Sequence, residues 1–214
     1  MRIVSLLPSA TDIVVALGAA DDLVGVSHSC SGDWDHLPKL TSTWVDTGAS
    51  AADIDEQVTT ASRPLYQLNI EALERLKPDV VISQSLCDVC AVPAGDVREA
   101  VLTLSSTPHL IDLSPDGLDD VPLCFRQVGD GVDRRSEASR LERRWHDTFA
   151  AHRNRHADKD VRLVFVDWLD PPFVAGHWCP KWSNGWASRT CSATRASHPS
   201  KPHGTLSTPL SPMY

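Results

Sequence analysis

The sequence lacks the features that mark several familiar classes of protein. No apolar run approaches the roughly 18 residues of a membrane-spanning helix, and the run Ile3–Leu7 is too short for a signal-peptide core. No Walker or GxGxxG motif follows a predicted strand, so nucleotide binding has no support. There is also no GxSxG motif. The 214 residues, 42% of them hydrophobic, therefore predict one or two globular domains with no membrane span, expected to be cytoplasmic as written.

Basic side chains are in the minority, and acidic ones are absent from the last part of the chain. The 28 acidic and 20 basic residues give a net charge of −8, which disfavours binding to nucleic acid or to an anionic membrane. All carboxylates lie at or before Asp170, so the first 170 residues carry a charge of −12 and the remainder carries +4. From Trp178 onward there is no Val, Ile, Phe, Asp or Glu. We expect residues 179–214 to be mostly disordered, because they cannot bury enough apolar surface to offset backbone ordering.

Short apolar runs alternate with helical patterns along the first 170 residues. The helices are expected at Thr11–Leu17 with Ser9 as N-cap, at Asn69–Leu76 with Asn69 as N-cap, at Asp96–Leu104, and over 118–156. The strands are expected at Arg2–Leu7, Leu23–Ser27, Asp79–Ser83, His109–Leu113 and Val161–Val166, with a polar loop over His28–Trp44. Nearly all-apolar strands that alternate with helices predict an α/β fold with a Rossmann-like parallel sheet.

Two groups of residues could carry chemistry. Cys87 and Cys90 form a CxxC motif, for which a redox pair, half of a zinc site and simple packing of a loop all stay open. The other four cysteines provide no second CxxC. Ligands of open α/β sheets bind at the carboxyl ends of the strands. Of the nine histidines, only His28 and His177 are placed where a ligand could meet them.

Three stretches resemble a known family. They are RIVSLLPSATDIVVALGAADDLVGVSHSC, LNIEALERLKPDVVISQSLCDVCAVP and VRLVFVDWLDPPFVAGHW. Over residues 2–178 the chain resembles the cobalamin-binding type of the class III substrate-binding proteins of ABC importers, a group that also carries ferric siderophores and haem. The resemblance implies two α/β lobes joined by one long rigid helix. It divides the chain into an N-terminal lobe (1–116), a linking helix (117–160), the start of a second lobe (161–178) and an aberrant tail (179–214).

The resemblance also implies a function and a binding site. The protein would be non-enzymatic, without catalytic residues, a metal site or a cofactor, and would deliver cobalamin or a related corrinoid or iron chelate to an ABC permease. Family members are usually extracytoplasmic or membrane-anchored. The residues expected to face the ligand are Pro8, Ser9, His28, Cys30, Gln84, Ser85, Asp88, Trp168, His177 and Trp178.

The chain departs from the family pattern after Trp178, where a full second lobe would follow. We hypothesise that a reading-frame shift near this codon replaced that lobe, which predicts weak or undetectable cobalamin binding because half of the cleft is missing. Two alternatives remain. One is an intracellular corrinoid or metal-chelate binder, and the other is a thiol oxidoreductase that uses Cys87 and Cys90.

Overall fold

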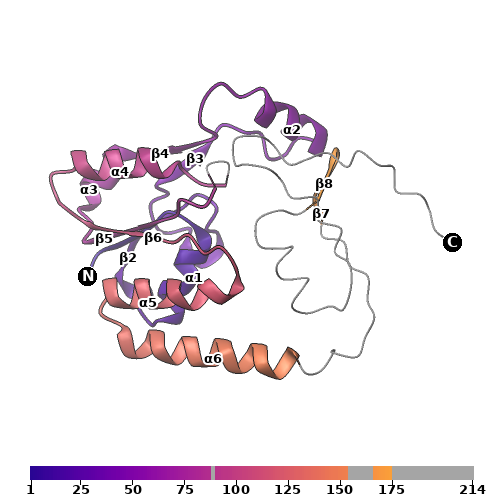
Figure 1. The fold of residues 1–214 in the computed structure, drawn as a ribbon. Helices are drawn as coiled ribbons and strands as arrows, with labels where there is room; N and C mark the ends of the chain where they lie inside the picture. Colours follow the sequence, from indigo (N-terminus) through magenta and orange to yellow (C-terminus); the bar gives the residue numbers. More distant parts are fainter. Residues whose placement is uncertain (88–89, 154–165, 175–214) are drawn as a thin grey trace. The chain divides into compact units, whose positions relative to one another are not determined.

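The computed structural model describes residues 1–87, 90–153 and 166–174 (Figure 1). The chain forms two compact units. The first unit comprises Met1–Trp44, Ser62–Pro115 and Asp119–Thr148. The second comprises Val45–Ala61, Asp116–Leu118 and the chain from Phe149 onward. In the described part of the chain, no helix has the length and apolar character needed to cross a bilayer.

The first unit is built on a four-stranded sheet in the order β2-β1-β5-β6. All three pairings are parallel. The strands are β1 (Ile3–Ser5), β2 (Leu23–Val26), β5 (Val80–Ser83) and β6 (His109–Asp112). Four of the five predicted strands are therefore found, each shorter than the apolar run that predicted it. The predicted α/β fold with a parallel sheet is confirmed.

The alternation of side chains along the strands creates two cores. Ile3, Val80 and Ile82 point to one face, where they pack with side chains of α1 (Pro8–Ala16) and α5 (Val121–Gly131) in what we call the first core. Val4 and Val81 point to the opposite face, where they pack with α3 (Ile70–Leu76) and α4 (Ala94–Thr103) in the second core. Figure 1 shows the two helix pairs on opposite sides of the sheet. The sheet is thus covered on both faces, as its apolar strands require.

The two predicted helix N-caps have different outcomes. Asn69 caps α3 as expected, since its side-chain oxygen accepts a hydrogen bond of 2.9 Å from the Ala72 amide. Ser9 was the wrong residue for α1, because this helix already begins at Pro8, with Leu7 at the N-cap position and no side-chain cap. Proline at the first position of a helix has a suitable φ and lacks the amide hydrogen that would otherwise need a partner.

The segment predicted as one long helix over 118–156 is wrong as a single element. It forms α5 and then α6 (Arg135–Arg153), with a break at Asp133, whose φ is +57°. The two helices are antiparallel neighbours, as their paired contacts show. These contacts join Phe125 to Trp145 and Arg126 to Glu142, while a Cβ on Gly129 would meet Ala138.

Several short elements lie in segments for which the sequence predicts loops or nothing. In the first unit, β3 (Thr41–Thr43) pairs antiparallel with β4 (Tyr66–Leu68). In the second unit, α2 (Ala51–Thr59) is a helix capped by Ser50, and β7 (Val166–Leu169) forms an antiparallel hairpin with β8 (Pro172–Val174). Except for Val166, the strand expected at Val161–Val166 lies outside the described residues, as does the tail expected to be disordered.

Candidate ligand-binding site

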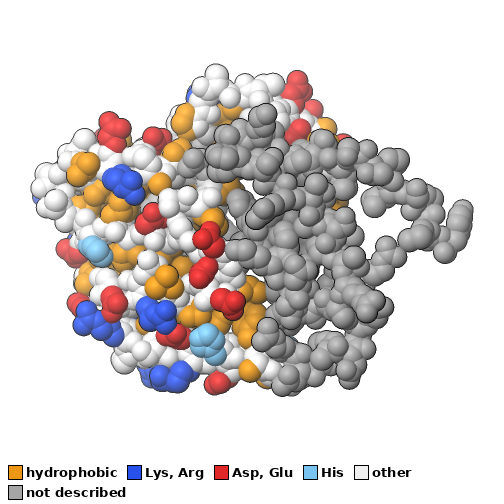
Figure 2. Space-filling model, in the orientation of Figure 1, with side chains coloured by type: hydrophobic (Ala, Val, Ile, Leu, Met, Phe, Trp, Pro, Cys, Tyr) orange, Lys and Arg blue, Asp and Glu red, His pale blue; other side chains and the backbone are white. Residues whose placement is uncertain are grey.

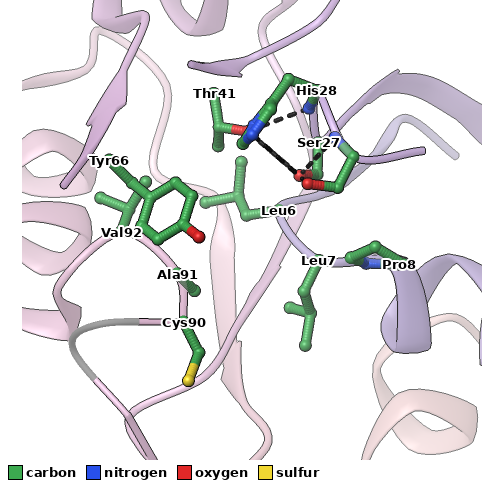
Figure 3. Close-up of a pocket in the computed structure, with 11 residues that line it drawn as sticks. Leu6, Leu7, Pro8, Ser27, His28, Thr41, Tyr66, Cys90, Ala91 and Val92 are labelled. Carbon is green, nitrogen blue, oxygen red and sulfur yellow. Dashed lines mark hydrogen bonds between the residues drawn. The ribbon is translucent and has the colours of Figure 1, made fainter. Parts of the chain in front are cut away.

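A shallow pocket opens at the carboxyl ends of the parallel strands in the first unit (Figure 3). Its walls come from residues after β1, after β2, in the β3–β4 pair and after β5. They are Leu6, Leu7, Pro8, Ser27, His28, Ser29, Thr41, Tyr66, Cys90, Ala91 and Val92. Its cavity volume is about 30 Å³. Enclosed sites for small molecules have roughly 300–1,000 Å³, so this wall can contact only part of a large ligand.

A hydrogen-bonded group of side chains holds His28 in the pocket wall. The Thr41 hydroxyl accepts a hydrogen bond of 3.0 Å from the His28 amide and shares one of 2.7 Å with the ring Nδ1. It also shares a hydrogen bond of 3.1 Å with the buried Ser27 hydroxyl. Partial burial lowers the pKa of His28 from its usual 6.5. The imidazole is therefore neutral at neutral pH and above, and its orientation is fixed through Nδ1.

Tyr66 supplies an aromatic surface beside this group. Its ring centroid lies 5.7 Å from that of His28, and the two rings are tilted by 37°. Figure 3 shows the Tyr66 ring between Val92 and Leu6. Neither Tyr66 nor Thr41 was predicted from the sequence to face a ligand. Alternating apolar residues around Leu65–Leu68 could have indicated β4, but no local pattern distinguishes Thr41 from its neighbours.

Only some of the residues expected to face a ligand line this pocket, while others are buried elsewhere in the first unit. Pro8 and His28 line the pocket together. Cys30 is buried in the first core, with its sulfur 3.4 Å from the Thr11 hydroxyl. Gln84 is buried and spans its own loop, since its Nε2 donates to the Cys87 carbonyl at 3.0 Å and its Oε1 accepts from the Leu86 amide at 3.2 Å.

Among the remaining predicted positions, Ser9 and Ser85 of the first unit do not line this pocket. Ser9 is exposed in the first turn of α1, and the Ser85 hydroxyl shares a hydrogen bond of 2.7 Å with Ser114. Trp168 belongs to the second unit, where its indole N–H lies 3.0 Å from both the Ala51 and the Asp170 carbonyl oxygens. The other expected positions lie outside the described residues: Asp88, His177 and Trp178.

The CxxC motif is a disulfide between Cys87 and Cys90 in this structure. The interpretation as half of a zinc site therefore does not hold, because both sulfurs are bonded to each other. Over the described ranges, no cluster of three or more His, Cys, Asp or Glu is placed to hold a metal ion. Cys30 and Cys124 are buried free thiols, and burial raises the pKa of Cys124.

The described residues of the pocket wall carry no formal charge. They supply hydroxyl, imidazole and apolar groups, and none of them is Asp, Glu, Lys or Arg. The face drawn in Figure 2 has acidic and basic groups interspersed, with no continuous basic patch among its described residues.

The chain has clear relatives among known structures. It is similar to the periplasmic heme-binding protein RhuT from Roseiflexus sp. RS-1, with 23% identity and a TM-score of 0.58 over 82% of this chain and 59% of RhuT. It is similar to the periplasmic vitamin B12 binding protein BtuF of Vibrio cholerae, with 19% identity and a TM-score of 0.60 over 89% of this chain and 68% of BtuF. The periplasmic heme-binding protein HutB of Vibrio cholerae matches with 20% identity and a TM-score of 0.59, over 82% of this chain and 59% of HutB. No curated protein matches the chain.

These structural likenesses show the fold, and a match to a protein family shows the family. The chain spans about three fifths of the length of RhuT and HutB. The periplasmic binding protein family matches residues 3–180, which is most of the chain. This family consists of solute-binding proteins rather than enzymes, in agreement with the prediction from the sequence. The chain belongs to the periplasmic binding protein family.

Proposed function

We propose that this protein is the substrate-binding component of an ABC importer and that its ligand is cobalamin or a related corrinoid. The family supports a role in solute binding. The structural neighbours include proteins named for binding heme and vitamin B12, so a large metal-containing ring is the class of ligand to test first. An ABC permease is the partner that this role requires.

The uncharged pocket wall is the observation that favours a corrinoid over haem. A corrin ring is surrounded mainly by neutral amides, which hydroxyl and imidazole groups can meet with hydrogen bonds. Haem carries two propionates, and carboxylates are best bound by Arg or Lys. The described lining of the pocket offers Ser27, Ser29, Thr41 and His28, and no cationic side chain.

The aromatic and apolar part of the wall suits the body of such a ring. Tyr66 and Pro8 present flat apolar surfaces beside the polar group around His28. Burial of apolar surface contributes about 25 cal/mol per Å², while the few polar groups fix the orientation of the ligand. In this proposal Trp168, His177 and Trp178 would contribute further ligand contacts.

The first test compares two ligands on the same protein. Cyanocobalamin and hemin are titrated separately into the purified chain, and binding is followed by calorimetry. We expect cyanocobalamin to bind at least about tenfold more tightly than hemin, which corresponds to about 1.4 kcal/mol. Tighter binding of hemin, or binding of neither, would contradict the proposed ligand.

A charge placed in the pocket should shift this preference. Ser29→Arg introduces a guanidinium next to the imidazole, because the Ser29 hydroxyl lies 3.3 Å from His28 Nε2. The variant should gain affinity for hemin relative to cyanocobalamin. The matched control is Ser31→Arg, which adds the same charge at an exposed position that does not line the pocket. Equal shifts in both variants would show that the pocket is not the binding site.

A further inference from the structure

One wall of the pocket contains a disulfide that solute binding alone does not explain. The described cysteines divide into two kinds. Cys30 and Cys124 are free thiols buried in the first core. Cys87 and Cys90 form a disulfide in the segment that follows β5, and Cys90 lines the pocket.

We propose that the Cys87–Cys90 disulfide is a reversible thiol–disulfide couple whose opening loosens one wall of the pocket and weakens ligand binding. For its binding readout, this inference rests on the proposed function. The two cysteines differ in their exposure to solvent. Cys87 is only 7% exposed, whereas Cys90 is exposed. A reducing thiolate therefore reaches the Cys90 sulfur first.

The exchange balances with a dithiol as reductant. One thiolate of the dithiol attacks the Cys90 sulfur and forms a mixed disulfide, while the electron pair of the S–S bond leaves with the Cys87 sulfur, which takes up a proton. The second thiol of the reductant then attacks the first sulfur of the same reductant molecule, which is bonded to Cys90 in the mixed disulfide. This releases Cys90, which takes up a proton and becomes a thiol. The protein gains two electrons and two protons, and the reductant closes into a cyclic disulfide.

The disulfide joins an anchored part of the segment to the wall of the pocket. Gln84 fixes the Cys87 side, because its buried amide bonds to the Cys87 carbonyl and the Leu86 amide. The Cys90 amide donates to the same Cys87 carbonyl at 3.3 Å. Beyond Cys90, Ala91 continues the wall and Val92 is buried in the second core.

Figure 3 shows Cys90 and Ala91 opposite Ser27 and His28. The His28 side of the pocket depends on hydrogen bonds to Thr41 and on the sheet, not on the disulfide. Opening the disulfide thus removes a covalent constraint from one wall and leaves the other in place. A residue that is free in the reduced protein must be ordered when the ligand binds. The free-energy cost of ordering one backbone residue lowers the affinity by about one order of magnitude, so reduction should weaken binding about tenfold.

The effect should be local rather than global. The entropic stabilisation by a disulfide grows with the length of the loop that it closes. This disulfide joins residues only three apart in the sequence, which is close to the shortest ring possible. Reduction should therefore change the thermal midpoint of unfolding by no more than a few degrees.

The test uses the full chain in three forms: oxidised, reduced with dithiothreitol and desalted without air, and the double variant Cys87→Ser/Cys90→Ser. Each form is titrated with cyanocobalamin and, separately, with hemin. We expect the reduced form and the double variant to bind about tenfold more weakly than the oxidised form. Dithiothreitol should leave the double variant unchanged, and reoxidation should restore the wild-type affinity. Affinities that agree within a factor of two would overturn the proposal, as would a disulfide that opens only on global unfolding.

A second readout separates this inference from the proposed function. If the oxidised form binds neither probe, the proposed function fails, and hydrogen exchange decides the inference. On reduction, the amides of Leu86, Cys90 and Ala91 should exchange faster, while that of His28 should not. Unchanged exchange at the first three amides would overturn the redox proposal whatever the ligand.

Discussion

The two faces of the four-stranded sheet are covered in different ways. The second core, under α3 and α4, consists entirely of aliphatic side chains. The first core, under α1 and α5, also contains a buried polar chain in which Thr11 donates to Ser5 at 2.8 Å and lies 3.4 Å from the Cys30 sulfur. On this side α5 also approaches α6 closely at Gly129, since a Cβ there would lie 2.5 Å from the Ala138 Cβ. One face is thus stabilised by the volume of its side chains, and the other also by close backbone approach and internal hydrogen bonds.

The largest effect should come from a cavity in the aliphatic core. Leu73 is 0% exposed on α3, and Leu73→Ala should lower the free energy of unfolding by about 2–5 kcal/mol because it removes buried methyl groups and leaves a void. Unfolding in urea, followed by circular dichroism, measures the change. Ile70→Ala, at a 48% exposed position of the same helix, is the control and should cost about 1 kcal/mol or less. Equal losses in the two variants would show that the second core is not packed as described.

The first core should respond to added volume instead. Gly129→Ala places a methyl group 2.5 Å from the Ala138 Cβ, and overpacking of this kind costs about 1–3 kcal/mol. Gly95→Ala is a matched control in α4, because a Cβ there would meet nothing within 4 Å. This control should stabilise the protein by about 0.4–1 kcal/mol by restricting the unfolded chain. The two substitutions should thus have opposite signs in urea unfolding, and the same sign would remove the basis of the comparison.

The sequence predicted the elements whose signals are local and strong. The strands β1, β2, β5 and β6 are buried on both faces, so their apolar runs are nearly unbroken and easy to recognise. The break between α5 and α6 was missed because the intervening residues, Val132–Arg134, have no proline or glycine. A Cβ on Gly129 would meet Ala138 of α6, so glycine at this position permits close packing between the two helices.

The binding pocket was less predictable than the fold. Pro8 and His28 were expected because they follow strands, and both line the pocket. Tyr66 and Thr41 come from the β3–β4 pair, which was not identified from the sequence. A bridge between Val26 and Lys39 brings Thr41 beside His28, and the pairing of β4 with β3, some 25 residues away in the sequence, brings Tyr66 there. Cys30 follows the same strand as His28 but points into the first core. Position after a strand indicates the edge of the sheet, whereas the direction of each side chain depends on contacts distant in the sequence.

A smaller loss should follow removal of the buried polar chain in the first core. In Thr11→Val, a methyl group of similar size replaces the hydroxyl, so the Thr11 donation to the Ser5 hydroxyl is lost. The contacts of this hydroxyl with the Leu7 carbonyl at 3.3 Å and the Cys30 sulfur at 3.4 Å are lost as well. Ser5 still donates to the Leu7 carbonyl at 3.0 Å, so the cost should be about 0.5–1.5 kcal/mol. Thr60→Val, at an exposed position, is the control and should stay within about 0.5 kcal/mol. No loss in Thr11→Val would mean that the polar groups of this core contribute nothing to stability.

The smallest expected effect is the pH dependence of stability that His28 causes. Burial lowers the pKa of His28 below its usual 6.5, so the unfolded chain binds a proton more readily than the folded one. The stability that the neutral imidazole contributes is therefore full above about pH 6.5 and is lost as the pH falls through the lower folded-state pKa. In His28→Gln, the thermal midpoint should drop less between pH 7.5 and pH 5 than it does in the wild type. Ser29→Ala removes only the hydroxyl that lies 3.3 Å from Nε2 and should keep the wild-type drop. An equal drop of the thermal midpoint in all three proteins would contradict this prediction. It would mean that His28 is as well solvated in the folded pocket as in the unfolded chain.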